Sequence, residues 1–180
     1  MIRFLHILMM CLLLIIGCFY WTDIELPDGR HIPKKFNFSI APATDDIIES
    51  TLIDYNAIYY VKHNDLISGL DQESYSYYRF WPNGRVMEKL SNILPSQDDA
   101  EDFSNAEIGY FKIDGTELVI ELFIPDTTIM NWGYILIFAN IIDGKIVFNK
   151  TVSQNKVSTG MDGITYKPLK FDKLSREPDW

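Results

Sequence analysis

Three short turns that contain glycine constrain the fold of this chain more than any other feature. They are Asn83-Gly84, Asp114-Gly115 and Asp143-Gly144, and each lies between runs rich in β-branched and aromatic residues. An asparagine or aspartate followed by glycine readily adopts the left-handed dihedrals that a two-residue β-hairpin requires. Each turn therefore predicts two antiparallel strands that are neighbours in one sheet.

The segments around these turns predict about eight strands. Their residue ranges are 57–61, 74–81, 86–90, 107–113, 117–124, 132–142, 145–152 and 164–171. Consecutive hairpins build an up-and-down antiparallel meander, because a short connection can join only neighbouring strands. We expect an all-β fold in which the meander closes into a small barrel, since closure removes the exposed edges of an open sheet. A flattened sandwich or an open curved sheet is the alternative.

One short helical turn is expected between two of the strands, within residues 95–103. Ser96 can cap its N-terminus, and the acidic residues Asp98, Asp99 and Glu101 follow. Serine is a preferred N-cap residue, and acidic side chains near a helix N-terminus interact favourably with the helix dipole. These residues predict a helix of only a turn or two.

The first twenty residues have the layout of a secretory signal. Arg3 precedes an apolar run, residues 4–17, that only His6 interrupts. This run is short for a bilayer span, which needs about 20 apolar residues. A signal peptide over residues 1–17 is therefore expected, and an uncleaved anchor that extends to residue 21 is the alternative.

The segment Ile15-Ile16-Gly17-Cys18 resembles the lipobox of bacterial lipoproteins. The resemblance implies cleavage before Cys18, a diacylglycerol on its thiol and an acyl chain such as palmitate on the new N-terminus. Two or three chains give stable anchoring. We expect a location in the cell envelope, at the outer membrane if the host has one. Residues 18–45 are expected to form a tether or an arm, and residues 46–180 the barrel domain.

The lipobox, the proline-containing tether and the meander together resemble the small lipocalin-like lipoproteins of bacterial envelopes. The aromatic hairpin over residues 77–86 is similar to those that such proteins use, although the Gly-x-Trp motif of true lipocalins is absent. The resemblance implies a calycin-type barrel that carries a small apolar ligand.

Charge and histidine content exclude several functions. The chain has 16 basic and 25 acidic residues, a net charge of −9, so nucleic acid is not an expected partner. His31 and His63 have no metal-ligand spacing, and no Gly-x-Ser-x-Gly nucleophile elbow is present. We expect a non-enzymatic protein with no metal and no cofactor.

Aromatic residues concentrated in the strands are the candidates for ligand binding. Tyrosine and tryptophan offer apolar contact together with a few hydrogen-bond donors, although the same residues also serve as packing and cross-strand pairs. Arg79 can either meet a ligand carboxylate at the barrel mouth or stack on its aromatic neighbours. The predicted ligand-binding residues are Tyr77, Arg79, Trp81, Tyr110, Trp132 and Tyr134.

The faces of two strands carry further expectations. Residues 132–142 are apolar on both faces, so the second face needs a cover: an N-terminal arm with Phe36 and Phe38, a helix, or a partner protein. Glu117 and Glu121 share the outward face of residues 117–124, where solvated side chains are expected.

These observations leave two hypotheses about function. The leading one is a lipid-anchored module that binds a small apolar molecule or a peptide. The alternative is a structural or assembly protein of the envelope that uses the second apolar face of residues 132–142 as its interface.

Overall fold

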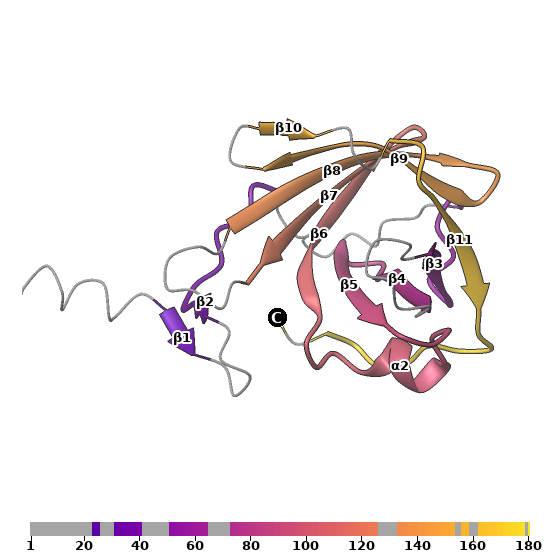
Figure 1. Ribbon diagram of the computed structural model, residues 1–180, viewed down its shortest axis with the longest axis horizontal. Coiled ribbons are helices and arrows are strands. Elements are labelled where there is room, and N and C mark those ends of the chain that lie inside the picture. Colours follow the sequence, from indigo (N-terminus) through magenta and orange to yellow (C-terminus); the bar gives the residue numbers. More distant parts are fainter. Residues whose placement is uncertain are drawn as a thin grey trace, which may run out of the picture. The chain divides into compact units, whose positions relative to one another are not determined.

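The computed structural model describes residues 23–25, 31–40, 51–64, 73–125, 133–153, 156–158, 162–178 and 180. Eight strands form a closed antiparallel barrel (Figure 1). Each barrel strand pairs with the next one along the chain, and the last pairs with the first. The predicted all-β meander and its closure are confirmed. The barrel strands are β3 (Ala57–Asn64), β4 (Glu73–Phe80), β5 (Arg85–Ser91), β6 (Glu107–Asp114), β7 (Glu117–Ile124), β8 (Gly133–Ile142), β9 (Lys145–Ser153) and β11 (Thr165–Lys170).

Three short strands add to the barrel strands in the part of the chain that the structure describes. β10 (Lys156–Ser158) pairs with β9. β1 (Asp23–Glu25) and β2 (His31–Pro33) form a two-stranded antiparallel sheet that was not predicted. This small sheet belongs to a separate compact unit, made of residues 1–37 and 125–132.

Two of the three predicted turns differ from the expected two-residue Asx-Gly loop. Asp143 and Gly144 do form one, with φ of 52° and 69°. The β6–β7 loop lies one residue later, at Gly115 and Thr116, because Asp114 pairs with Glu117. In the β4–β5 turn the Trp81 N–H donates to the Arg85 carbonyl, 2.9 Å, which leaves a three-residue loop. Its last residue, Gly84, has φ of 81°, the left-handed position such loops require.

The two ends of the barrel differ. At one end, which we call the hairpin end, lie the tight β4–β5, β6–β7 and β8–β9 turns. At the other, the loop end, β3, β5, β7 and β9 end and β4, β6 and β8 begin. Ile53, from the segment before β3, joins the core and is only 3% exposed. The barrel thus presents a tightly turned end and an end built from longer connections.

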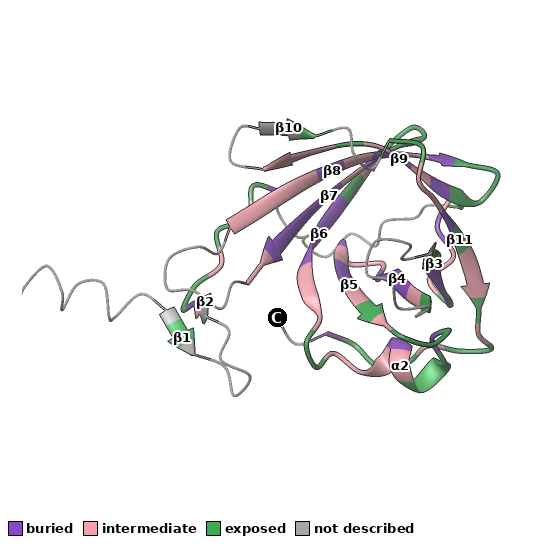
Figure 2. Cartoon of the chain, viewed as in Figure 1, coloured by how far each residue is buried: buried purple, intermediate pink, exposed green. Residues whose placement is uncertain are grey.

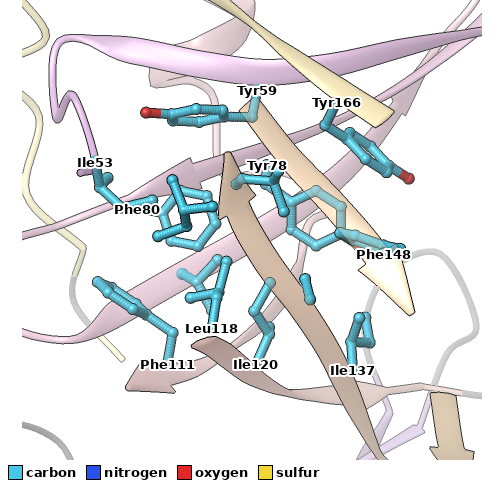
Figure 3. Packing of buried hydrophobic residues seen from close by; sticks show 14 of the residues in the cluster. Ile53, Tyr59, Tyr78, Phe80, Phe111, Leu118, Ile120, Ile137, Phe148 and Tyr166 are labelled. Carbon is cyan, nitrogen blue, oxygen red and sulfur yellow. The ribbon is translucent and has the colours of Figure 1, made fainter. Parts of the chain in front are cut away.

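Alternating residues of the strands fill the barrel with apolar side chains (Figure 3). Burying each large aliphatic or aromatic side chain stabilises the fold by about 1.5–3 kcal/mol. Edge-to-face ring contacts link several of them, as between Phe80 and Phe111, whose centroids are 5.0 Å apart. The inward-facing buried residues are Tyr59, Tyr78, Phe80, Val86, Phe111, Leu118, Ile120, Leu122, Ile137, Ala139, Ile141, Ile146, Phe148 and Tyr166.

A second core lies on the outer face of the barrel and explains why β4 is buried along most of its length (Figure 2). α2 (Gln97–Glu101) packs on this face together with the C-terminal segment, residues 171–178 and Trp180. The predicted Ser96 cap is confirmed, because Ser96 Oγ accepts a hydrogen bond from the Asp99 N–H at 3.3 Å. The Asp99 carboxylate in turn accepts one from the Ser96 N–H at 2.8 Å.

The predicted signal peptide, residues 1–17, and the predicted lipidation site, Cys18, lie outside the described residues. Their assignment stays a prediction. Among the residues that are described, no helix is both long and apolar enough to cross a membrane.

Candidate functional site

Polar side chains gather inside the barrel toward the loop end. Ser76 on β4 lies between two partners from neighbouring strands: its Oγ is 2.8 Å from His63 Nε2 and 2.9 Å from Tyr166 Oη. The three residues come from β3, β4 and β11, which are adjacent only because the barrel closes. Ser76 is 2% exposed and Tyr166 is fully buried, so this chain of hydrogen bonds runs from the interior toward a half-buried histidine.

A row of three ionisable side chains continues this polar region across the next strands. Tyr78 on β4 pairs directly with Glu88 on β5, which pairs with Glu107 on β6. All three share the inward face with core residues two or four positions away on their own strands, such as Val86 and Phe111. We call His63, Ser76, Tyr78, Glu88, Glu107 and Tyr166 the loop-end site.

The Tyr78 hydroxyl is the most unusual group of this site. The side chain is fully buried, and its Oη makes no hydrogen bond of normal geometry with the described residues. Burial raises the Tyr78 pKa well above its ordinary value, and the nearby Glu88 and Tyr166 add to the effect. Buried hydroxyl groups are usually hydrogen-bonded, and the groups near enough to partner this one are the Glu88 carboxyl and the Tyr166 hydroxyl.

The electrostatics of Glu88 are equally distinctive. Desolvation raises the pKa of its carboxyl to about 8, and the Glu107 carboxylate opposite adds to the shift. Near neutral pH the Glu88 carboxyl therefore holds a proton for most of the time and can donate a hydrogen bond.

Apolar side chains surround these polar groups. The Tyr78 and Tyr166 rings meet edge to face with centroids 5.1 Å apart, and Phe148 stacks on Tyr166 at 4.6 Å. Several half-buried aliphatic side chains pack against the core near the same end. They are Val61, Ile124, Ile135 and Ile164. The loop-end site thus offers hydrogen-bonding groups within an apolar surface, the usual composition of a small-molecule site.

The Ser76–His63 contact has the distance of a nucleophile and its base. However, β4 pairs with β3 and β5 on either side of Ser76, which uses the backbone N–H groups that an oxyanion hole would need. No group of three or more His, Cys, Asp or Glu side chains that could hold a metal ion occurs among the described residues. The arrangement is better suited to binding than to acyl transfer.

A groove of about 640 Å³ lies at the hairpin end, beside residues 51–56 and the β8–β9 turn. Its polar groups satisfy one another. Lys170 Nζ is 2.8 Å from the Asp54 carboxylate, and the Asp54 N–H donates to Tyr59 Oη at 2.9 Å. This groove therefore has less need of a ligand than the loop-end site.

The predicted ligand-binding residues fall into two groups, both on the outside of the barrel. The first group, Tyr77, Arg79 and Trp81, lies beneath α2 and the C-terminal segment. Arg79 donates to the carbonyls of Ala100 and Arg176, both at 2.9 Å. Its guanidinium also stacks on Trp81, 4.4 Å from the ring centroid, which is the stacking alternative expected from the sequence.

The second group, Tyr110 and Tyr134, lies on the outer face of β6 and β8. Both rings meet Phe38 edge to face, with centroids 4.9 Å and 5.1 Å apart. The sixth candidate, Trp132, lies outside the described residues. Ligand binding by these six residues stays a prediction, and their observed contacts are with the protein itself.

Phe38 belongs to a short arm, residues 38–40, that covers part of the outer face of β6, β7 and β8. The predicted cover by the N-terminal segment is confirmed for Phe38. The expectation that Glu121 is solvated was wrong. Glu121 is 4% exposed, because Ile40 of the arm packs over it and donates its backbone N–H to the carboxylate at 2.7 Å. Glu117, four residues earlier on the same face of β7, is exposed as expected.

No protein-family model, curated protein or solved structure matches this chain. The loop-end site was missed at the sequence level. Its signal was nevertheless present, because strand alternation places Ser76 and Tyr78 on the same face as Phe80, and Glu88 on the same face as Val86.

Proposed function

We propose that this protein is a lipid-anchored lipoprotein of the cell envelope that binds a small molecule, without chemical conversion, at the loop end of its barrel. The observation that carries the proposal is the buried Tyr78 hydroxyl, which makes no normal hydrogen bond with the described residues. A buried polar group left unsatisfied costs about 1–3 kcal/mol. A ligand that offers this hydroxyl a partner of normal geometry recovers part of this free energy on binding.

The surroundings of Tyr78 specify an amphipathic ligand. Ser76, Glu88 and Tyr166 offer hydroxyl and carboxyl groups for a polar end of the molecule. The half-buried aliphatic side chains near the loop end offer contact for an apolar part. Such a ligand gains free energy both from hydrogen bonds and from removal of apolar surface from water.

Cys18 supplies the proposed attachment to the membrane. The arm at residues 38–40 packs on the barrel, so the tether is the chain between Cys18 and Phe38. β1 and β2 pair antiparallel within this stretch, so the tether is shorter than a fully extended chain, which would span about 3.3–3.6 Å per residue. The ligand would then be bound outside the bilayer.

An interaction protein of the envelope is the second candidate. Part of the β8 face on which this idea first rested lies under Phe38. A different group of apolar side chains supports this candidate. Leu90 near the end of β5, and Ile93 and Leu94 just after it, are 73%, 68% and 48% exposed. Exposed apolar patches often mark contact surfaces.

Intact-mass and native mass spectrometry of the full-length protein, extracted from membranes in mild detergent, tests the proposal. We expect cleavage before Cys18 with added acyl chains, and a co-purifying small molecule. Tyr78→Phe removes the hydroxyl and is expected to lose that molecule. Tyr59→Phe is the matched control, because its hydroxyl already has a partner at the hairpin end, and it should retain the molecule.

Two results would contradict parts of this proposal. An unmodified full-length mass would make residues 4–21 a membrane anchor instead. Equal ligand occupancy in the Tyr78→Phe and wild-type proteins would place the binding site elsewhere, and the absence of any bound molecule would favour the interaction protein.

A further inference from the structure

Three exposed apolar side chains lie close together in the sequence at the loop end of the barrel. They are Leu90, Ile93 and Leu94, at the end of β5 and just after it, and they are 73%, 68% and 48% exposed. We call these three residues the apolar rim. Residues 90–97 contain no charged side chain, so contact with an apolar medium would remove no charge of this segment from water.

The local structure presents the apolar rim outward. The Ile93 N–H donates to Ser91 Oγ at 3.2 Å, which bends the chain directly after β5. Pro95, the residue after Leu94, is buried, and Ser96 then caps α2. Because the protein holds this short segment on both sides, the exposure of Ile93 and Leu94 is built into the fold.

Leu90 connects the apolar rim with the loop-end site. It pairs directly with Ser76 and lies two residues beyond Glu88 on the inward row of β5. Ser76 is 2% exposed, whereas Leu90 is 73% exposed. β5 pairs with β6 only from Arg85 to Glu88, so Leu90 lies past the end of that pairing. The apolar rim therefore borders the loop-end site.

The N-terminal arm joins the barrel on the side of the same end. The Phe38 ring contacts Tyr134, the second residue of β8, and β8 begins at the loop end. Ser39 and Ile40 line a pocket together with Phe138, which lies four residues further along β8 toward the hairpin end. The arm thus runs from the loop end toward the hairpin end, and the tether meets the barrel where the arm begins.

We propose that the loop end of the barrel docks on the surface of the membrane, with the apolar rim inserted among the lipids. This inference rests on the N-terminal membrane attachment of the proposed function, and it adds a second contact that orients the barrel. In this orientation the loop-end site faces the lipid surface, so an amphipathic ligand can reach the site directly from the membrane.

The size of the apolar rim favours a lipid surface over a protein partner. A stable protein interface takes about 20–30 residues from each side, far more than three exposed side chains. Apolar side chains can instead enter the boundary between lipid headgroups and acyl chains one at a time. The anchor supplies a high effective concentration at the membrane, so even a weak second contact is made most of the time.

Charge restricts the kind of lipid that fits. The chain has a net charge of −9, and Asp98, exposed in the first turn of α2, follows the apolar rim closely. Anionic headgroups would repel these charges. We therefore expect docking on electrically neutral headgroups such as phosphatidylethanolamine and phosphatidylcholine, and weaker docking at low salt when phosphatidylglycerol is added.

Fluorescence quenching tests the proposal on the membrane-extracted protein, reconstituted in vesicles of phosphatidylethanolamine and phosphatidylcholine. Ile93→Cys carries a bimane label in the apolar rim. Ile142→Cys is the matched control, because Ile142 is 51% exposed but lies at the hairpin end. We expect nitroxide-labelled lipids to quench the label at residue 93 at least about twofold more than the label at residue 142. Iodide in the aqueous phase should show the reverse order.

Variants locate the contact. Leu90→Asp together with Leu94→Asp, in the Ile93→Cys background, places charges in the apolar rim and should reduce lipid quenching to the level seen at residue 142. The replaced side chains are exposed, so the barrel should stay folded, which thermal unfolding checks. Ile142→Asp in the same background is the control and should leave quenching of the label unchanged.

Three results would overturn the docking proposal. The first is equal quenching by lipid at residues 93 and 142. The second is shielding of residue 93 from iodide only when the protein is dense in the vesicles, which would indicate contact with a second copy. The third is shielding only in native membranes, which would indicate a protein partner.

The mass of the labelled protein separates this inference from the proposed function. Cleavage before Cys18 and acylation of its thiol would leave one free thiol in the Ile93→Cys protein, so one label per chain is expected. Additional labels would show that the lipid anchor is wrong. Cys11→Ser and Cys18→Ser would then restore a single thiol, and the same quenching comparison would still decide the docking of the uncleaved chain.

Discussion

The carboxylate of Glu121 accepts a hydrogen bond from the backbone N–H of Ile40, a residue 81 positions earlier in the chain, with 2.7 Å between the two heavy atoms. Both residues are buried, at 4% and 8% exposure. The bond joins the arm to the centre of β7, next to the Phe38 contacts with Tyr110 and Tyr134. One side chain of the barrel wall therefore holds the arm in place.

Glu121→Ala should remove this attachment. Loss of a buried acceptor leaves the Ile40 N–H unsatisfied, which costs about 1–3 kcal/mol. We expect a lower free energy of unfolding in urea and faster proteolysis near residue 40. Glu121→Gln retains an acceptor oxygen and should recover most of the loss. Glu117→Ala, on the same face but exposed, should change stability by less than about 0.5 kcal/mol; an equal effect of both alanine variants would contradict this role.

Arg79→Met tests the connection between the barrel and the C-terminal segment. The change keeps much of the apolar stem but removes the donor to the Ala100 carbonyl and one of two donors to the Arg176 carbonyl, which also accepts from Trp81 Nε1 at 3.0 Å. We expect a loss of about 2–4 kcal/mol, because hydrogen bonds from a charged donor contribute about 1.5–3 kcal/mol each. Hydrogen exchange should also become faster in residues 171–178.

Arg176→Ala is the control for Arg79→Met. It keeps the accepting carbonyl and removes an exposed side chain that donates to the Glu101 carbonyl and lies over the Phe103 ring, so its cost should stay below about 1 kcal/mol. A larger loss for Arg176→Ala than for Arg79→Met would show that the outer side chain, and not the buried guanidinium, holds the segment.

Gly109→Ala should be among the most damaging small substitutions in the barrel. A Cβ at this position would lie 1.9 Å from the backbone oxygen of Glu121 on the paired strand, so the two strands would have to separate. We expect destabilisation at or above the upper end of the roughly 1–3 kcal/mol typical of overpacking. Gly163→Ala has open space around its Cβ and only an unfavourable φ of +78°, so it should cost about 1–2 kcal/mol. Thermal unfolding of both variants provides the comparison.

Glu88 should make the barrel less stable as pH rises. Its pKa is about 8 when folded, against an ordinary value of 4.5. The folded state therefore holds the proton more tightly, and this stabilisation, complete below the unfolded pKa, is lost as pH increases toward 8. The slope can approach about 1.4 kcal/mol per pH unit.

Urea unfolding between about pH 5 and 8 measures this slope, because acids with lowered pKa, such as Asp54 and Glu101, lose their contribution only at lower pH. Glu88→Gln should give a flatter profile, and Glu117→Gln should keep the wild-type slope. Identical slopes in the wild type and Glu88→Gln would show that another group is responsible.

The strands were predictable because each one carries its own signal. Alternation along residues 117–124 and glycine in the Asp143-Gly144 turn depend only on near neighbours in the chain. Closure followed from the same strands, since each short connection joins neighbours. Only the details of two turns depended on pairing that local sequence does not specify, as between Asp114 and Glu117.

The loop-end site and the burial of Glu121 could not be predicted from local sequence in the same way. Ser76 meets Tyr166, 90 positions away, only because β11 and β4 both flank β3. Alternation placed Glu121 on the outer face correctly, but burial of that face depends on the arm that covers it. Arg79 and Trp81 share an outer face for the same reason, and the C-terminal segment turns that face into a second core.

The pairing of Ala57 with Lys170 has a consequence for how the protein is made. Every other pairing between barrel strands joins strands that follow one another along the chain, so those pairs can form while synthesis continues. Until residues 165–170 emerge, β3 and β9 remain unpaired edges of the kind that recruit other chains. A chain that ends before Thr165 would form an open curved sheet that is prone to aggregation. Synthesis of the last residues therefore decides whether the closed barrel or the open sheet forms.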